Sequence, residues 1–431
     1  MTEFFTPGLP EVLDDALAIR FCSNSADVEE VVALNALVHG VTESEAVRRW
    51  LCDGHPHIRR EGWLYVQERS SGRAVATLGL MPLIWRYATA SLPVAELGFV
   101  ATHPDYRRRG LQRVLSATFD RLATANGYTL AAIEGIPYFY RQFGYEYALP
   151  LSDSRFVFAL ELLPPRPADT YRFYPAAKSD VPQLMAFYQK HSHPLAITTV
   201  RPQVMWHHYL NLNLASAGSP VPAGELAGLR PYLVQNRGKV SGYVALTPSG
   251  WANRLNIVEL AADDRETIMS TLAFARNQAS ELGHEAVGLQ LPACHPACQV
   301  AGYLGIRPER EYGWQMKVLD VVRFLQTVSP ALEERLNGSV LRGHSGSMVI
   351  DLYRQRVELS FDAGRVTIRP ANVEAEEDVR LPPGVATQLW LGWKPMDALV
   401  DWHRDVWVRD EMRLLVDILF PPARAHIYLG Y

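Results

Sequence analysis

Apolar and polar residues in the first 160 positions follow two alternating patterns, one typical of strands and one typical of helices. The strand-like runs are 63–67, 73–80, 95–102, 128–134 and 156–160. The helical runs are 28–37, with Ser25 as its predicted N-cap, 111–125, which Gly127 ends, and a short piece at 138–142. This alternation predicts an α/β fold for the first part of the chain.

A proline cluster at 163–167 is typical of a linker between domains. Beyond it, the predicted elements are helices at 181–190 and 266–282 and strands at 232–235 and 241–247, followed by a helix at 318–336 and strands at 348–353, 356–361 and 365–369. The clearest hairpin signal, Asp362-Ala363-Gly364, lies between the last two strands. We expect three domains, 1–163, 168–317 and 318–431, of which the last combines helices with an antiparallel sheet.

The composition excludes several classes of protein. Of the 431 residues, 48% are apolar and 20% are charged, which favours packed domains over disorder. A net charge of −4 is not typical of a nucleic-acid-binding protein. The longest apolar run, 78–85, is far shorter than the roughly 20 residues of a membrane span, and 1–10 has no secretory pattern. Four cysteines, without a second ligand pair near Cys294 and Cys298, predict neither a disulfide scaffold nor a metal site, so we expect a soluble cytoplasmic protein.

One stretch, 100–115, runs from a strand through a basic loop into an amphipathic helix. Gly110 allows a close approach between backbone and ligand, and the first turn of a helix offers unpaired N–H groups to an anion. Arg107, Arg108 and Arg109 add charge-assisted hydrogen bonds. The stretch lacks both the Walker sequence and the glycines of a dinucleotide fingerprint. It therefore predicts a pyrophosphate site of another kind.

The segment 103–110, His-Pro-Asp-Tyr-Arg-Arg-Arg-Gly, resembles the acetyl-CoA motif of the GNAT superfamily of N-acetyltransferases, whose core is Arg/Gln-x-x-Gly-x-Gly/Ala. Arg107 and Gly110 match that core, and Gln112 departs from it. Downstream, 138–145 resembles the second GNAT signature, a short helix that ends in Phe-Gly-Phe/Tyr. The resemblance implies a mixed central sheet flanked by helices and acetyl-CoA as cosubstrate. It assigns the pantetheine arm to the strand residues Val100, Ala101 and Thr102, and the pyrophosphate to Arg107, Arg108, Arg109, Gly110, Leu111 and Gln112.

The order of the domains is similar to that of the enhanced-intracellular-survival (Eis) acetyltransferases. These chains carry two GNAT-like domains and then a sterol-carrier-protein-like domain. The middle segment has no Arg-x-x-Gly loop, so it resembles a degenerate GNAT copy without cofactor. The resemblance also implies a homo-oligomer, with a hexamer as the state suggested by the family.

The resemblance implies a general acid and two competing bases. Tyr140 matches the tyrosine that protonates the departing coenzyme A sulfur, and a phenol with a pKa of about 10 is protonated at neutral pH. One candidate base is the C-terminal carboxylate of Tyr431, at the end of the apolar tail 427–431, which we expect to be packed. The other is Glu96, because 95–100 resembles the strand that carries a glutamate base in histone-acetyltransferase-like GNATs.

These expectations favour an acetyl-CoA-dependent N-acetyltransferase that modifies an amine of a small molecule, aminoglycoside-like or polyamine-like. A cationic acceptor needs carboxylates, and the N-terminal helices that flank a GNAT acceptor cleft carry five, at Asp27, Glu29, Glu30, Glu43 and Glu45. Two other functions stay open at this point. One is acetylation of protein lysines through Glu96, and the other is a non-catalytic protein that binds a lipid or an acyl-CoA.

Overall fold

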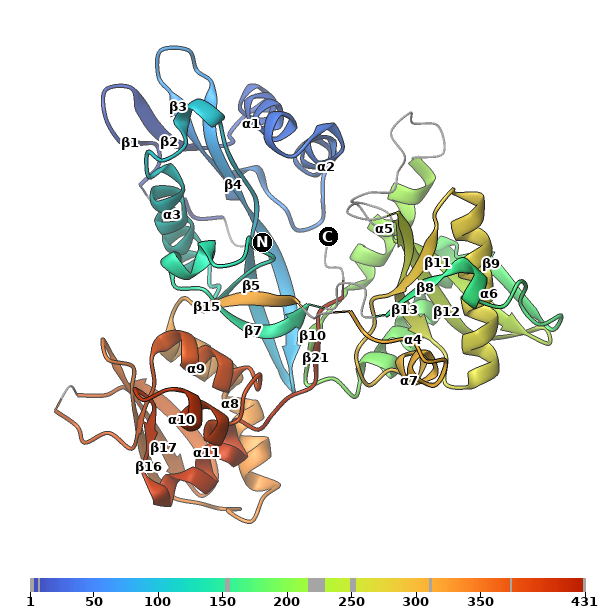
Figure 1. Ribbon diagram of the computed structural model, residues 1–431. Helices are drawn as coiled ribbons and strands as arrows, with labels where there is room; N and C mark the ends of the chain where they lie inside the picture. The colour runs from blue at the N-terminus through green and yellow to red at the C-terminus, as the bar shows by residue number, and fades with distance from the viewer. Residues whose placement is uncertain are drawn as a thin grey trace.

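The computed structural model describes residues 4–6, 8–151, 156–215, 229–248, 253–309, 312–372 and 374–428. The chain forms three sheets, each with its own helices (Figure 1). The first sheet has the order β1-β2-β3-β4-β5-β6-β15-β7. Its strands are β1 (Glu11–Val12), β2 (Leu17–Phe21), β3 (Trp63–Glu68), β4 (Ala74–Tyr87), β5 (Ala90–Thr102), β6 (Leu130–Ile133), β15 (Tyr312–Val318) and β7 (Glu146–Leu151).

Successive residues of a strand point to opposite faces of the sheet, so strands of mostly apolar residues leave both faces of the first sheet apolar. Helices cover both of these faces. On one face, α1 (Ser25–Val38) and α2 (Val41–Cys52) pack on Trp63, Tyr65 and Met81. On the other face, α3 (Leu111–Ala125) packs on the intervening apolar residues of the strands. The prediction of Ser25 as N-cap is wrong, since the side chain of Asn24 accepts the hydrogen bond from the Asp27 N–H.

The second sheet has the order β8-β14-β13-β12-β11-β9. Its strands are β8 (Phe156–Ala159), β9 (Tyr171–Pro175), β11 (Arg230–Asn236), β12 (Lys239–Pro248), β13 (Arg254–Ala261) and β14 (Ala286–Leu289). Its helices are α4 (Val181–Ser192), α5 (Gln203–Ala215), α6 (Arg265–Glu281) and α7 (Pro296–Tyr303). Apart from a short strand between α4 and α5 that pairs with the first sheet, this unit repeats from β9 the succession seen from β2 in the first: a strand, two helices, three strands, a helix and a strand. The order of elements in the second unit is therefore similar to that in the first, and its identity as a degenerate GNAT copy stays a prediction.

The two units exchange strands. β8 follows β7 directly in the chain, yet it pairs with β14 at the edge of the second sheet. β15 follows the second unit, yet it lies between β6 and β7 in the first sheet and is antiparallel to both. The predicted domain limits 1–163 and 168–317 stay a prediction, and these two strands cross them. Neither sheet is complete without a strand from the other half of the chain.

The third unit is an α+β structure. Its helices are α8 (Val321–Asn337), α9 (Pro383–Trp390), α10 (Met396–Trp402) and α11 (Arg413–Leu419). Its strands are β16 (Gly346–Asp351), β17 (Arg356–Asp362), β18 (Arg365–Pro370), β19 (Val379–Arg380) and β20 (Trp407–Val408). The helix and the three antiparallel strands predicted at its start are confirmed. The likeness to a sterol carrier stays a prediction.

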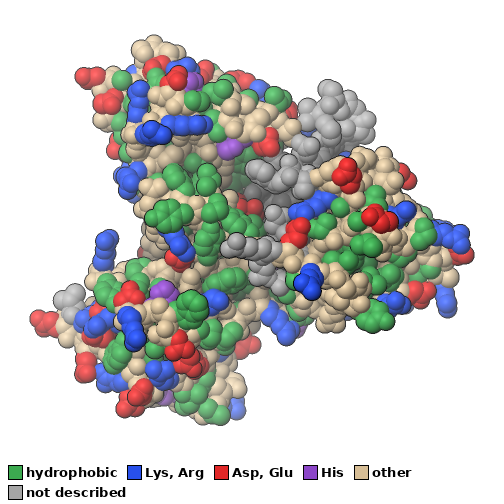
Figure 2. Space-filling model, viewed as in Figure 1, with side chains coloured by type: hydrophobic (Ala, Val, Ile, Leu, Met, Phe, Trp, Pro, Cys, Tyr) green, Lys and Arg blue, Asp and Glu red, His purple; other side chains and the backbone are tan. Residues whose placement is uncertain are grey.

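The third unit packs tightly against the first. Buried residues of β4 and β5 share one apolar cluster with residues of α8 and α9. The Tyr87 hydroxyl donates to the carbonyl of Trp390 at 2.6 Å and accepts from Arg335 at 3.1 Å. Acidic and basic side chains are interspersed on the face of this unit shown in Figure 2. No helix in the described parts of the chain has both the length and the apolarity needed to span a membrane.

The end of the chain returns to the junction between the first two units. β10 (Ile197–Thr199) is antiparallel to the end of β4, and β21 (Ala425–His426) runs parallel to β10. The Thr199 hydroxyl donates to the carbonyl of Tyr428 at 2.7 Å, and the buried Tyr428 ring lies against Tyr188. The predicted packing of the tail is thus confirmed as far as Tyr428.

Candidate functional site

The first sheet opens at the end of β5. β5 and β6 pair in parallel at Val94, Ala95 and Glu96 and no further, so the two strands diverge after Glu96. On its other edge β5 pairs with β4, but the register shifts around Phe99, whose φ is +52°. Such a bulge turns the strand locally and leaves a residue outside the ladder. The edge of β5 that bears Val100, Ala101 and Thr102 therefore faces the opening with backbone groups that β6 does not pair.

Aromatic side chains hold this bulge in place. The Phe99 ring lies 5.2 Å from that of Trp50 and 5.8 Å from that of Trp63, measured between centroids. The His39 ring, 6.3 Å away, bonds to the backbone of Val100, and burial lowers the pKa of His39. Sequence reasoning missed Phe99 and His39, because nothing in the order of residues near them marks a bulge.

The basic loop joins β5 to α3 as the sequence predicts. Arg107, Arg108 and Arg109 are all exposed. Arg108 and Gly110 have left-handed φ values of +64° and +75°, a conformation that glycine adopts without strain, and open space surrounds the position of a Gly110 side chain. Gly110 is the N-cap of α3 and no side chain caps the helix, so its first N–H groups are available beside three guanidinium groups. This arrangement suits a pyrophosphate.

Gln112 departs from the motif, and the structure gives the reason. Its side chain turns back toward the strand, where Nε2 donates to the carbonyl of Ala101 at 2.8 Å and to the hydroxyl of Thr102 at 3.0 Å. The backbone N–H of Gln112 remains in the first turn of α3. Gln112 therefore links the anion loop, residues 107–110, to the open end of β5.

Tyr140 lies in the 3-10 turn Phe139–Phe143 that follows β6. It is 4% exposed and contacts Phe139 and Tyr145 edge to face. A Cβ at Gly135 would approach the Tyr140 ring to 2.2 Å, so only glycine at 135 leaves the ring this position. Burial raises the pKa of Tyr140 above its ordinary value, which keeps the hydroxyl protonated at neutral pH.

Of the two candidate bases, only Glu96 is among the described residues. Glu96 is 3% exposed at the last position where β5 pairs with β6, and its partners across the sheet are Met81 on β4 and Ala132 on β6. Tyr431 lies outside the described residues. The last described residues, from Ala425 to Tyr428, run parallel to β10 and thus in the direction from Tyr87 toward Trp85 on β4.

Most of the acidic residues proposed for a cationic acceptor are engaged elsewhere. Asp27 is buried and accepts hydrogen bonds from Ser23 and from the Tyr65 hydroxyl, at 2.8 Å in the latter case. Glu29 and Glu45 form ion pairs with Arg48, and Glu30 accepts the Ala74 N–H. Of these four carboxylates, Glu29 and Glu45 are paired with a cation, and Asp27 and Glu30 accept hydrogen bonds from neutral groups.

The second unit has a different helix start at the matching place. The first helix after its three antiparallel strands, α6, is capped by the side chain of Asp264, which accepts from the Thr267 N–H. An acidic cap repels a phosphate. Among the described residues, no group of three histidines, cysteines or carboxylates is placed to hold a metal ion.

Comparison with known proteins agrees with this geometry. Residues 19–148 match the family model of the acetyltransferase (GNAT) domain. No curated protein sequence matched the chain. Among solved structures, a conserved protein of unknown function from Enterococcus faecalis V583, described as a probable N-acyltransferase, has a TM-score of 0.69 at 13% identity, over 96% of this chain and 100% of that one.

Two further structures have the same coverage, 96% of this chain and 100% of theirs. A GCN5-related N-acetyltransferase from Kribbella flavida has a TM-score of 0.65 at 17% identity. Eis1 from Mycobacterium abscessus has a TM-score of 0.60 at 15% identity. At such low identity the likeness shows a shared fold, and it extends over all three units.

Proposed function

Because residues 19–148 form a GNAT acetyltransferase domain, we propose that this protein is an N-acetyltransferase that moves an acetyl group from acetyl-CoA to the amine of a small molecule. The observation that carries the proposal is the opening between β5 and β6, flanked by the uncapped start of α3 and three exposed arginines. An extended thioester with a diphosphate at its other end matches that arrangement. The cosubstrate would bind with its pantetheine arm along Val100–Thr102.

The chemistry needs an acid and a base. The neutral amine nitrogen attacks the thioester carbonyl, the carbon–sulfur bond breaks, and the sulfur leaves as a thiol once it gains a proton. Tyr140 is the proposed donor of that proton, since it is buried and lies in the turn after β6, one of the two strands that flank the opening. The amine proton passes to a carboxylate, for which Tyr431 and Glu96 remain the two candidates. A thiol-release assay with acetyl-CoA over a panel of amines tests this function. If none of the amines caused thiol release, the proposal would be contradicted.

The anion loop gives the first prediction. Arg107→Glu together with Arg109→Glu should raise the Kd for acetyl-CoA at least tenfold, about 1.4 kcal/mol, because the change replaces two cations with two anions at the helix start. Isothermal titration calorimetry measures it. The matched control is Arg69→Glu with Arg121→Glu, which alters the net charge equally on exposed residues outside the loop. Equal affinities for both double variants would contradict the proposed cofactor site.

The base gives the second prediction. Extending the chain after Tyr431 removes the terminal carboxylate from that position and leaves the anion loop intact. If that carboxylate is the base, we expect the extended protein to bind acetyl-CoA normally and to lose at least nine-tenths of its thiol release, and Glu96→Gln to cost less. A fully active extended enzyme beside an inactive Glu96→Gln variant would assign the base to Glu96 instead.

Three finer expectations belong to the proposal. The acceptor class, aminoglycoside-like or polyamine-like, stays part of the proposal, and four of the five acidic residues predicted for it have partners within the fold. Cytoplasmic location fits four cysteines that are all free thiols. A homo-oligomer, as implied by the Eis-like resemblance, is tested by light scattering.

A further inference from the structure

A strand that follows the second unit in the chain reaches the loop that leads to Tyr140. β15 lies between β6 and β7, and Gln315 on β15 pairs with Ile133 at the end of β6. Residues 134–138 form the loop between β6 and the turn that contains Tyr140. Gln315 therefore lies beside this loop, although it follows Gly135 in the chain by 180 residues.

Two side chains of β15 donate to one carbonyl of this loop. Nε2 of Gln315 lies 2.9 Å from the carbonyl oxygen of Gly135, and the Tyr312 hydroxyl donates to the same oxygen. Gln315 is fully buried and Tyr312 is half-buried. Because a carbonyl oxygen has two lone pairs, these two donors use its full accepting capacity. The orientation of the Gly135 carbonyl is thus fixed relative to β15.

Gly135 in turn contacts the ring of Tyr140. A Cβ at Gly135 would lie 2.2 Å from Cδ2 and 2.4 Å from Cε2 of Tyr140, and 3.2 Å from Nε2 of Gln315. Cε2 is bonded to the carbon that bears the hydroxyl, so the contact lies close to the end of the ring that would donate a proton. The other rings around Tyr140 belong to its own turn or follow it directly: Phe139, Phe143 and Tyr145.

The loop between Gly135 and Tyr140 has a strained backbone. Tyr138 has a φ of +71° and a ψ of −35°, a conformation that residues with a side chain rarely adopt. The side chains of Ile136 and Tyr138 are 67% and 80% exposed, so their burial does not stabilise it. A strained backbone persists where the surrounding structure holds it. β15 supplies such contacts at Gly135, and Nε2 of Gln315 also lies 3.5 Å from the carbonyl oxygen of Ile136.

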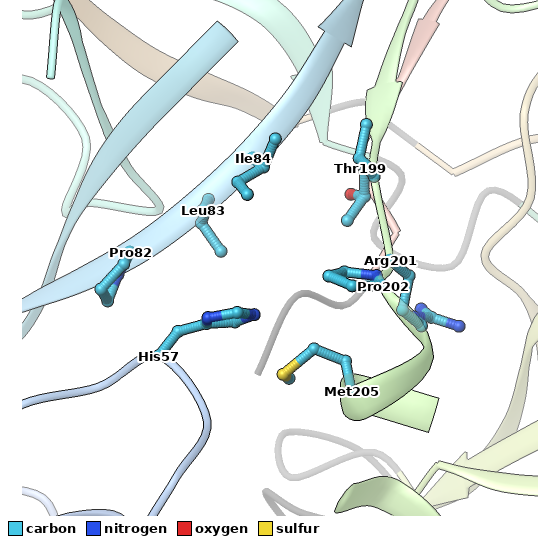
Figure 3. Close-up of a pocket in the computed structure, with 9 residues that line it drawn as sticks. His57, Pro82, Leu83, Ile84, Thr199, Arg201, Pro202 and Met205 are labelled. Atoms are coloured by element: carbon cyan, nitrogen blue, oxygen red, sulfur yellow. The ribbon is translucent and has the colours of Figure 1, made fainter. Parts of the chain in front are cut away.

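The first sheet meets the second half of the chain at another place as well (Figure 3). There, a small pocket is lined by His57 and residues 82–84 on one side and by residues of the segment 199–205 on the other. None of the residues that line this pocket belongs to the loop or the turn of Tyr140. Of these two contacts, only the one made by β15 reaches the proposed acid.

From these contacts we propose that Gln315 is a positioning residue for acetyl transfer. By holding the Gly135 carbonyl, together with Tyr312, it keeps the Tyr140 hydroxyl directed at the sulfur of coenzyme A. The inference rests on the proposed function and adds to it a residue outside the segment 19–148 that matches the family model. Since a misplacement of about 1 Å can lower a rate by roughly 10²-fold, loss of this support should be visible in kcat.

Gln315→Met tests the inference, because it keeps the length of the side chain and removes the donor. Oε1 of Gln315 has no hydrogen-bond partner within the described structure, so the change removes no acceptor that is in use there. In the thiol-release assay with the full-length protein, we expect kcat to fall at least about tenfold. The KM for acetyl-CoA should stay unchanged, since the anion loop and β5 are intact.

The matched control is Gln388→Met on α9. Nε2 of Gln388 also donates to a backbone carbonyl at 2.9 Å, that of Tyr147 on β7, which is not part of the Tyr140 loop. This variant should retain nearly full kcat. If Gln315→Met does not fold, Tyr312→Phe provides the same test, because it removes the other donor to the Gly135 carbonyl from a half-buried side chain.

Combination with Tyr140→Phe distinguishes a positioning role from a general loss of stability. If Gln315 acts through the Tyr140 hydroxyl, Gln315→Met should lower kcat less than about threefold once that hydroxyl is absent. An equal loss with and without the hydroxyl, or an unchanged kcat for Gln315→Met alone, would overturn the inference and leave the acetyltransferase in place. Absence of thiol release with every amine would overturn the proposed function itself.

Discussion

Tyr140→Phe is expected to lower kcat by roughly 10²–10⁴, the range that proton transfer by a positioned side chain contributes. The departing sulfur of coenzyme A gains a proton, and the Tyr140 hydroxyl stays protonated because burial raises its pKa. The ring contributes the packing against Gly135 and Tyr145, and phenylalanine keeps that ring. Affinity for acetyl-CoA should therefore change little, and the loss should fall on kcat.

Steady-state kinetics with acetyl-CoA and the best amine measure this effect. Tyr145→Phe is the matched control, because Tyr145 is equally buried in the same aromatic cluster and its hydroxyl has no hydrogen-bond partner within the described structure. It should retain nearly full activity. If Tyr140→Phe retained its kcat as well, Tyr140 would be a packing residue and the acid would have to be sought elsewhere.

Arg201→Met should lower the free energy of unfolding by about 3–5 kcal/mol, the usual cost of removing one partner from a buried ion pair. The side chains of Arg201 and Glu259 are 1% and 2% exposed, and their charged atoms lie 2.5 Å apart. Glu259 also accepts from the Tyr243 hydroxyl at 2.7 Å. Loss of the guanidinium leaves a carboxylate without its counter-charge among aromatic rings. Urea denaturation, followed by tryptophan fluorescence, measures the change.

The double variant Arg201→Met with Glu259→Met separates the two contributions to this loss. It removes both charges, so it should be clearly more stable than Arg201→Met alone. Lys190→Met is the exposed control: its pair with Asp263 is 63% exposed on both sides and should contribute less than about 1 kcal/mol. A single variant no less stable than Lys190→Met would show that the buried pair does not stabilise the second unit.

The parts of the site that sequence predicted are those whose chemistry is local. Arg107 to Gly110 lie next to each other in the chain, and a strand before them and an amphipathic helix after them place the loop without reference to the rest of the fold. Tyr140 could be predicted for the same reason, because the aromatic residues that mark its short turn are its neighbours in the chain. The limits of α3 agree with the spacing of its apolar residues.

The parts that sequence did not predict depend on contacts between distant segments. The bulge at Phe99 is held by Trp50 and His39 from the N-terminal helices, and His55 meets His208 across a unit boundary. The strand character of 156–160 was correctly predicted, but alternation along one strand does not identify the sheet to which it adds. Acidic residues such as Asp27 and Glu30 were predicted to face a ligand because a sequence does not show which backbone or side-chain groups donate hydrogen bonds to them.

The exchange of β8 and β15 also sets an order of events during synthesis. Of the eight strands in the order from β1 to β7, β15 is the last to leave the ribosome, after the whole of the second unit. At roughly 5–20 residues per second, roughly 160 residues between β7 and β15 take roughly 10–30 seconds. During that interval β6 and β7 have unpaired edges, which are prone to pair with other chains. A nascent chain that stalls near residue 300 would therefore hold an incomplete catalytic sheet, and chaperones that cover strand edges would matter most at that stage.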